Sequence, residues 1–402
     1  MPSNIFIGMI FILQNYMRKI FCFFISLLLF SCAEKSVKNK YYGKFDNNCS
    51  IQILGKKDII IDENFSPTSM YIQYIDHTNE LSIYNAHDNS VYFFDYDQGI
   101  MSRKKQFSLE GSKGVGLIQG YDYVNEDSLF VYNVNTEFVC LLNSHLEIIW
   151  KRRLNIDELQ SMDFIPSFPY LQTNSPMKYI SHKLVFGGMG TAETTAETST
   201  NRPVTTIYDF QEDSVKFANN YPEQYQKYNW GGGFYRMPYF DVNEEENNMI
   251  ISFPQDHYLY VYSLQNNMQS KYYAGSNLIK EIKAYDEKKD LRTNNNEDRV
   301  RDWFFSIPTY RSILYDKYRN LYYRFACLPK TEKLRKFVSG TQPVIVIVLD
   351  KDFNYLGEGM LPDDIDMRYT NSFVTKDGLN IQVVNDNEDL MTFYQFKIEI
   401  NE

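Results

Sequence analysis

The sequence has few cysteines, few histidines and no cluster of positive charge. Its five histidines never stand at the HxH, HxxxH or HExxH spacings that mark a metal site. Its 41 Lys and Arg are outnumbered by 51 Asp and Glu, for a net charge of −10, and no basic run offers a face to nucleic acid. The GxSxG nucleophile elbow is also absent. We therefore predict no metal, no cofactor, no nucleic-acid partner and no catalytic residue that a motif would reveal.

Long apolar runs are scarce as well, and the one near the N-terminus is short. Residues 20–30 make an apolar run of about a dozen residues, whereas a helix that spans a ~30 Å bilayer core needs about 20. Arg18 and Lys19 precede the run and Ser31-Cys32 end it, which is the order of a secretory signal peptide. We interpret residues 1–32 as that peptide, with Met17 as the true start; a retained transmembrane anchor is the alternative.

The end of this segment, Leu29-Phe30-Ser31-Cys32, resembles the bacterial lipobox. The resemblance implies that Cys32 is acylated and becomes the first residue of the mature chain. Acyl chains contribute ~0.8 kcal/mol per buried methylene, enough for two or three of them to hold a soluble domain on a membrane. We expect residues 33–48 to form a tether and the protein to lie in the cell envelope on the outer membrane. Because residues 33–36 lack a strongly acidic export run, we expect the periplasmic face rather than the cell surface.

Aromatic residues are abundant and follow a repeating pattern. The chain has 33 Tyr and 29 Phe, and residues 81–103 show the sequence strand, turn, strand, turn, strand. About 47 residues later, residues 128–152 repeat this three-arm pattern, and such a period is typical of a β-propeller blade. At 402 residues the chain exceeds the roughly 250–300 residues of a single core, which a ring of repeats accommodates.

We predict an all-β fold, a six-bladed β-propeller over residues 49–402. The sixth blade has one strand fewer than the others. Short apolar stretches at 51–54 and 59–61 predict two strands, at least one of which joins the C-terminal blade and closes the ring, since an open ring leaves unpaired edges. A separate N-terminal hairpin is the alternative. The blades are predicted at 70–107, 118–154, 183–210, 249–274, 310–354 and 369–400.

The connections between blades carry few signs of chemistry. Residues 110–116 are glycine-rich without P-loop spacing, so they predict a sharp turn, with a ligand-facing nest of backbone N–H groups as the alternative. The doubled TAET at 191–198 predicts a surface loop, and the charged residues 280–301 predict a solvated loop or a short exposed helix. Cys49, Cys140 and Cys327 lie in apolar strand contexts, which favours buried free thiols.

The chain also resembles the TolB-like six-bladed β-propeller lipoproteins of unknown function found in Bacteroidetes. The resemblance lies in the lipobox, the glycine-rich residues 111–116, and residues 310–316 leading to Tyr322-Tyr323-Arg324-Phe325. It covers most of the mature chain and implies a propeller fold and an envelope location. It supplies no catalytic residues to carry over.

Two stretches pair aromatic rings with arginine and are candidates for ligand binding. They are Trp230-Gly231-Gly232-Gly233-Phe234-Tyr235-Arg236 and Arg301-Asp302-Trp303-Phe304-Phe305. A ring can stack on a sugar or planar group while a guanidinium binds a carboxylate or hydroxyl. The alternative is that the tryptophans fill gaps between blades. The candidate residues are Trp230, Tyr235, Arg236, Arg301, Trp303 and Arg324.

We therefore expect a lipid-anchored binding or scaffold propeller of the cell envelope that recognises a protein, peptide or glycan without catalysis. A sensor partner of a membrane complex would differ only in its ligand. The alternative is a glycan-active lyase or hydrolase, which requires paired carboxylates or a Tyr, Arg and His set at the mouth of the central channel. The fold alone does not decide between them.

Overall fold

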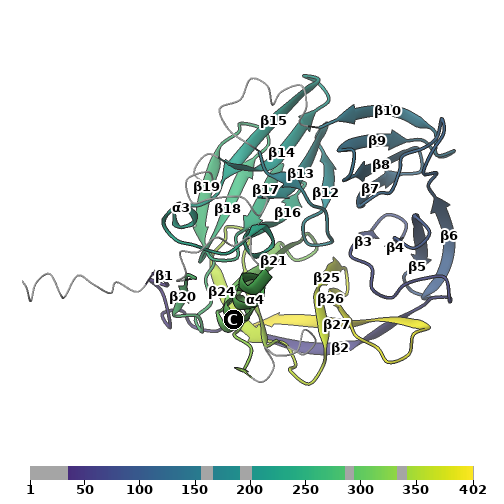
Figure 1. Ribbon diagram of the computed structural model, residues 1–402. Helices are drawn as coiled ribbons and strands as arrows, with labels where there is room; N and C mark the ends of the chain where they lie inside the picture. Colours follow the sequence, from purple (N-terminus) through teal and green to yellow (C-terminus); the bar gives the residue numbers. More distant parts are fainter. Residues whose placement is uncertain (1–34, 155–165, 191–201, 286–293, 333–341, 402) are drawn as a thin grey trace, which may run out of the picture. The chain divides into compact units, whose positions relative to one another are not determined.

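The computed structural model describes residues 35–154, 166–190, 202–285, 294–332 and 342–401. Within residues 37–402, six antiparallel sheets of at least four strands surround a common centre, and this confirms the predicted six-bladed β-propeller (Figure 1). The predicted signal peptide with Cys32, and the threonine-rich loop at 191–198, lie outside the described residues. No helix of the described part of the chain is long and apolar enough to cross a membrane.

Each of the first five blades is a run of four consecutive strands. Blade 1 contains β3 (Ile72–Ile75), β4 (Glu80–Asn85), β5 (Ser90–Asp95) and β6 (Ile100–Gln106). Blade 2 contains β7 (Gly120–Asn125), β8 (Ser128–Asn133), β9 (Phe138–Leu142) and β10 (Ile148–Arg153). Blade 3 contains β12 (Met177–Ile180), β13 (Lys183–Met189), β14 (Pro203–Asp209) and β15 (Ser214–Asn220), and the short β11 (Phe168–Pro169) pairs with one end of β13. Blade 4 contains β16 (Tyr239–Asn243), β17 (Asn248–Ser252), β18 (Tyr258–Ser263) and β19 (Gln269–Tyr273). Blade 5 contains β21 (Thr309–Asp316), β22 (Leu321–Cys327), β23 (Val344–Leu349) and β24 (Tyr355–Met360).

The sixth blade takes its outermost strand from the start of the ring. Its own strands are β25 (Met367–Thr375), β26 (Gly378–Val383) and β27 (Leu390–Ile400), and β2 (Cys49–Ile60) adds to β27 along its whole length. Cys49 lies opposite Ile400 and Ile60 opposite Leu390. The predicted ring closure is therefore confirmed, and the separate N-terminal hairpin is wrong.

The closing strand differs from the prediction in one respect. The apolar stretches at 51–54 and 59–61 predict two short strands, but β2 is one strand of 12 residues that includes residues 55–58, with a bulge between Ile53 and Gly55. The outermost strand of a blade has a solvent-facing side, so Lys56 and Lys57 extend the strand without disturbing the core. The polar residues 55–58 therefore belong to the outermost strand and do not interrupt it.

Residues 37–48, which we call the N-terminal strap, lie along the outer edges of blades 4 and 5. Strand β1 (Ser36–Lys38) pairs with β20 (Glu281–Lys283), which belongs to the connection between these blades. The Asn39 amide donates hydrogen bonds to the carbonyl oxygens of Ser276 (2.9 Å) and Ile279 (2.8 Å). The Phe45 ring stacks on Tyr273 and Tyr355, with centroids 5.5 and 5.0 Å apart. Most of the segment expected to be a tether is thus attached to the ring.

The core of each blade is apolar, as the strand patterns indicated. Every residue of β23, a run of Val, Ile and Leu, is buried, so this strand is covered on both faces. The three described cysteines, Cys49, Cys140 and Cys327, are buried and free, as predicted. The charged insertion contains α4 (Asn294–Ser306), and the burial of Val300 and Phe304 shows that this helix packs on the ring instead of standing in solvent.

Candidate functional site

The innermost strands of the six blades all enter the channel from the same face. They are β3, β7, β12, β16, β21 and β25, and each leads through a tight hairpin into the second strand of its blade (Figure 1). These hairpins therefore gather on one face of the ring, which we call the hairpin face. A cavity of about 360 Å³ opens there, and we call it the hub pit.

Five blades contribute to the hub pit. Its walls include Gln73 and Tyr74 of blade 1, Lys178 of blade 3, Asp241 of blade 4, Tyr315 of blade 5 and Ser372 of blade 6. At its mouth, the lining residues Asp76, Glu244, Glu245, Lys317 and Tyr318 come from three hairpins. A site assembled from so many blades leaves no local motif in the sequence.

The other end of the channel is crossed by a turn from the connection between blades 2 and 3. Thr173 and Pro176 of this turn line the hub pit. Hydrogen bonds hold the turn to blades 1, 4, 5 and 6. They include Thr173 N–H to Met70 O (3.0 Å), Phe240 N–H to Asn174 O (3.3 Å), Asn174 Nδ2 to Ser312 Oγ (2.9 Å) and Thr173 Oγ1 to Asn371 Oδ1 (3.0 Å). Because the turn contacts blades on several sides of the axis, it closes this end, and the pit is blind.

Polar side chains on the innermost strands join neighbouring blades around the pit. In each case a side-chain oxygen accepts a backbone N–H from the innermost strand of the next blade. The three contacts are Gln73 Oε1 with Tyr123 N–H (2.9 Å), Asp122 Oδ2 with Tyr179 N–H (2.7 Å) and Asp241 Oδ2 with Tyr315 N–H (2.8 Å). A buried backbone N–H needs a partner, so these three residues stabilise the ring, and two of them, Gln73 and Asp241, also line the pit.

One lysine lies among the carboxyl groups of the pit. Lys178 Nζ is 3.7 Å from Asp122 Oδ1. Burial lowers the pKa of the Lys178 ammonium, but the three carboxylates around it raise that pKa by more, so the lysine stays charged. Those carboxylates belong to Asp122, Asp241 and Glu244.

Burial affects two of these acidic groups, Asp241 in the wall of the pit and Asp122 beside Lys178. Burial raises the pKa of the Asp122 carboxyl, and it raises the pKa of Asp241 to about 6 despite the hydrogen bond from Tyr315 N–H. Asp241 thus changes its protonation state close to neutral pH. The charge of the hub pit is correspondingly sensitive to pH in this range.

A bridge of side chains crosses part of the mouth. Lys317 Nζ lies 2.7 Å from Asp76 Oδ2, and the Tyr318 hydroxyl donates to the same carboxylate. These contacts run from the blade 5 hairpin to the blade 1 hairpin, past blade 6. The mouth is therefore narrowed on the blade 6 side.

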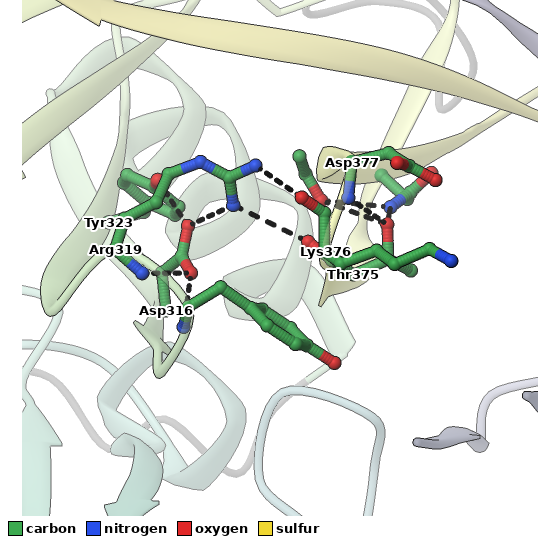
Figure 2. Close-up of polar contacts among 9 residues, drawn as sticks. Asp316, Arg319, Tyr323, Thr375, Lys376 and Asp377 are labelled. Carbon is green, nitrogen blue, oxygen red and sulfur yellow. Dashed lines mark hydrogen bonds and ion pairs between the residues drawn. The ribbon is translucent and has the colours of Figure 1, made fainter. Parts of the chain in front are cut away.

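The base of the blade 5 hairpin is fastened to blade 6, as Figure 2 shows. Asp316 is fully buried and accepts hydrogen bonds from Arg319 Nη1 (2.9 Å) and the Tyr323 hydroxyl (2.6 Å). Arg319 in turn donates to the carbonyl oxygens of Thr375 (3.4 Å) and Lys376 (2.7 Å) in the blade 6 hairpin. The hairpin that carries Lys317 and Tyr318 of the bridge is therefore held in a fixed position.

The structure brings five of the six predicted ligand residues together, away from the hub pit. They lie where η1 (Gly233–Arg236) meets α4, with the Trp230 and Trp303 rings 6.4 Å apart. Trp230 is buried, and its Nε1 donates to Gln224 O at 2.9 Å. Tyr235 is half-buried and packs on Phe304, with centroids 4.8 Å apart.

The two arginines of this group differ in exposure. Arg236 is buried with its guanidinium 5.8 Å from the Tyr221 ring centre, whereas Arg301 is exposed and pairs with Asp298 at 2.7 Å. The burial of Trp230 matches the alternative in which the tryptophans fill a gap between blades. Ligand binding by these five residues stays a prediction.

Arg324, the sixth candidate, lies fully buried between blades 4 and 5. Its guanidinium is 3.9 Å from the Tyr310 ring centre, and burial lowers its pKa to about 10. Its four acceptors are Ser252 Oγ (3.0 Å) and the carbonyl oxygens of Ala274 (3.0 Å), Phe253 (3.3 Å) and Asp256 (2.8 Å). An arginine placed in this way joins two blades, and contact with a ligand would require the blades to part.

The sequence reasoning missed the residues of the hub pit. A usable signal was present, because the pit-lining residues Gln73, Lys178 and Asp241 are each a lone polar residue between apolar or aromatic residues in the first strand of a blade, and so is Asp122, which lies beside Lys178. Aligning the blades by their first strands would have placed these residues together. In the described part of the chain, no group of three His, Cys, Asp or Glu side chains is arranged to hold a metal ion.

Comparison with known proteins places the chain in a family. A family model described as a domain of unknown function, DUF4221, matches residues 48–360. The crystal structure of a DUF4221 member from Bacteroides vulgatus is similar, with a TM-score of 0.73 at 19% identity over 89% of this chain and 100% of that one. A putative exported protein from Bacteroides fragilis has a TM-score of 0.53 at 12% identity, over 90% of this chain and 98% of its own. No curated protein matches. The protein with this hub pit is thus a propeller of the DUF4221 family.

Proposed function

We propose that this protein is a non-catalytic binding propeller of the cell envelope that recognises a protein, peptide or glycan at the hub pit. The observation that carries the proposal is a blind cavity on the ring axis, lined by five blades and open on the hairpin face. Its volume of about 360 Å³ lies in the range of ligand pockets, which are concave and hold a few convergent polar groups. The envelope location and the lipid on Cys32 are part of the proposal.

The charge of the pit indicates the kind of ligand. Among its lining residues, the four acidic ones outnumber Lys178 and Lys317, so the site favours a ligand with a positively charged group. The acidic residues are Asp76, Asp241, Glu244 and Glu245. Tyrosine rings in the wall offer apolar faces with polar tips, which suits a basic peptide or an amino sugar.

The binding test uses the exposed acidic pair at the mouth. Arrays of peptides and glycans would be probed with the wild type and with the variant Glu244→Gln/Glu245→Gln. Because each exposed charge contributes roughly 0.2–1 kcal/mol, we expect about a tenfold loss of affinity for the ligand found. The control Glu110→Gln/Glu212→Gln changes the same charge at exposed positions outside the pit and should bind as the wild type does. Equal binding by both variants would contradict the proposed site.

The anchor is tested separately by fractionation. Cys32→Ala should move the protein from the membrane fraction to the soluble fraction, because the acyl chains supply the membrane affinity. An unchanged distribution would end the anchor proposal. A pull-down of the intact lipoprotein from envelope membranes would identify a protein partner and show whether the protein belongs to a larger complex.

A second candidate function is a glycan-active lyase or hydrolase, and Asp241 favours it. A carboxyl group with a pKa of about 6 in a tyrosine-lined pit is suited to general acid or base catalysis. However, both Asp241 oxygens accept backbone hydrogen bonds, from Tyr315 N–H (2.8 Å) and Val242 N–H (2.9 Å), which gives this residue a structural role. Glycan turnover by the purified protein that disappears in Asp241→Asn, with the fold intact by circular dichroism, would replace the binding proposal with this one.

A further inference from the structure

The N-terminal strap and the β20 region form a basic surface on an acidic protein. Residues 37–48 and 278–284 carry five lysines against two acidic residues, Asp46 and Glu281, which leaves a local charge of +3. The whole chain has a net charge of −10. We call these two segments the strap surface. Figure 1 shows β1 and β20 side by side at the edge of the ring.

The strap surface also exposes apolar and aromatic side chains. Tyr41, Tyr42 and Leu278 are 40%, 46% and 56% exposed, and all five lysines are exposed as well. Tyrosine is enriched at membrane–water interfaces, where its ring lies among lipid headgroups, and lysine is attracted to anionic headgroups. The combination matches the chemistry of an anionic bilayer surface. The lysines are Lys38, Lys40, Lys44, Lys280 and Lys283.

The strap surface is held in place by the ring. Besides the Asn39 hydrogen bonds, the Tyr41 ring lies edge-on to Tyr273 with centroids 4.5 Å apart, and Lys44 Nζ is 5.8 Å from the Tyr41 ring centre. Lys38 and Lys283 flank Glu281, so that one carboxylate is shared between two ammonium groups. Because the backbone of the strap is already held on the ring, binding to a surface does not require this segment to fold first.

The strap surface is also close to the proposed anchor along the chain. Four residues lie between Cys32 and Val37, where the unit containing the ring begins, and the five steps along the chain, at 3.3–3.6 Å each, span at most about 18 Å. A lipid on Cys32 would therefore keep the strap surface within that distance of the bilayer. This step rests on the lipid anchor of the proposed function.

We propose that the strap surface lies against the anionic headgroups of the membrane, so that blades 4 and 5 face the bilayer edge-on. The acyl chains would supply the attachment and the strap surface the orientation. The hub pit, which opens along the ring axis, is then not covered by the membrane.

The test uses vesicles and a chain that has no lipid. The chain beginning at position 32 with Cys32→Ala would be sedimented with vesicles of phosphatidylethanolamine and phosphatidylglycerol in a 3:1 ratio, and with vesicles of phosphatidylcholine alone. Each lysine near such a surface contributes roughly a fivefold factor in affinity. The variant Lys40→Gln/Lys44→Gln/Lys280→Gln should therefore bind the anionic vesicles on the order of a hundredfold more weakly.

The control variant Lys216→Gln/Lys351→Gln/Lys376→Gln removes the same charge from exposed positions elsewhere and should bind as the wild type does. We expect binding to fall with added salt and to be absent with phosphatidylcholine. The proposal would be overturned if the protein did not bind anionic vesicles, or if both triple variants lost the same affinity. If the basic surface binds an acidic protein instead of a membrane, no binding to the vesicles is expected. Since the assay omits the lipid, its failure leaves the fractionation test of Cys32 unaffected.

Discussion

Acidification should destabilise the ring through His257, which is buried where the N-terminal strap meets blade 4. Its Nε2 lies 3.3 Å from Val37 O and its Nδ1 lies 2.8 Å from the Tyr310 hydroxyl. A carbonyl oxygen only accepts, so Nε2 carries the proton of the neutral ring and Nδ1 accepts from Tyr310 O–H. Burial lowers the pKa of His257 from 6.5 to about 4.

The sign and size of the effect follow from that pKa. The unfolded chain protonates this histidine near its ordinary pKa of 6.5 while the folded protein resists protonation until about pH 4, so stability is present above pH 6.5 and is lost as the pH falls. The loss from this group is about 2 kcal/mol between pH 7 and pH 5, and about 3 kcal/mol by pH 4.

The assay is urea unfolding followed by tryptophan fluorescence at pH 7, 6, 5 and 4.5, for the wild type and for His257→Gln. Glutamine does not titrate, and its amide can still donate to Val37 O. The variant should therefore show a smaller loss of stability between pH 7 and pH 5, by about 2 kcal/mol. If the free energies of unfolding of the two proteins fall in parallel over this range, the reasoning about His257 is refuted.

Three further substitutions test the ring itself by urea unfolding. Ile59→Ala should cost about 2–5 kcal/mol because Ile59 is fully buried in the closing strand, whereas Ile60→Ala, next to it and 55% exposed, should change stability by no more than about 0.5 kcal/mol. Gly357→Ala should destabilise the protein by about 1–3 kcal/mol, since the added Cβ would lie 2.8 Å from the backbone nitrogen of Cys49, the first residue of the closing strand. Gly232→Ala should be tolerated, because a Cβ at Gly232 would meet nothing within 4 Å. Arg324→Met should cost at least about 3 kcal/mol because three buried carbonyl groups lose a donor, and a loss of ligand binding with unchanged stability would contradict that role.

Several features of the fold could be predicted because they depend on local pattern. Alternating aromatic and branched residues between Asn, Asp and Gly turns identify strands wherever they lie in the ring. The sequence of blade 6 predicts one strand fewer than the other blades have. Because an open sheet edge needs a partner, the N-terminal segment was the candidate for the fourth strand. The burial of Cys49, Cys140 and Cys327 likewise followed from their apolar neighbours.

The errors and omissions have physical reasons too. The sequence predicts two strands in place of β2 because an outermost strand has one side in water, and the polar residues between the two apolar stretches remove the alternation that predicts a single strand. Trp230 and Arg236 lie six positions apart with three glycines between them, a pattern that predicts ligand binding, but tertiary packing buries both side chains. Sequence proximity of an aromatic ring and an arginine does not determine their exposure.

The sequence alone determined the class of fold, the number of blades and the strand that closes the ring, because hydrogen-bonded hairpins and alternating burial are properties of short segments. Only the tertiary structure brought together the residues around the hub pit, where we propose that a ligand binds. Gln73, Asp122, Lys178 and Asp241 follow one another at intervals of 49, 56 and 63 residues and meet because each occupies the same position on the innermost strand of a different blade. Their shared environment, and with it the raised pKa of Asp241, arises from closure of the ring and not from any one repeat.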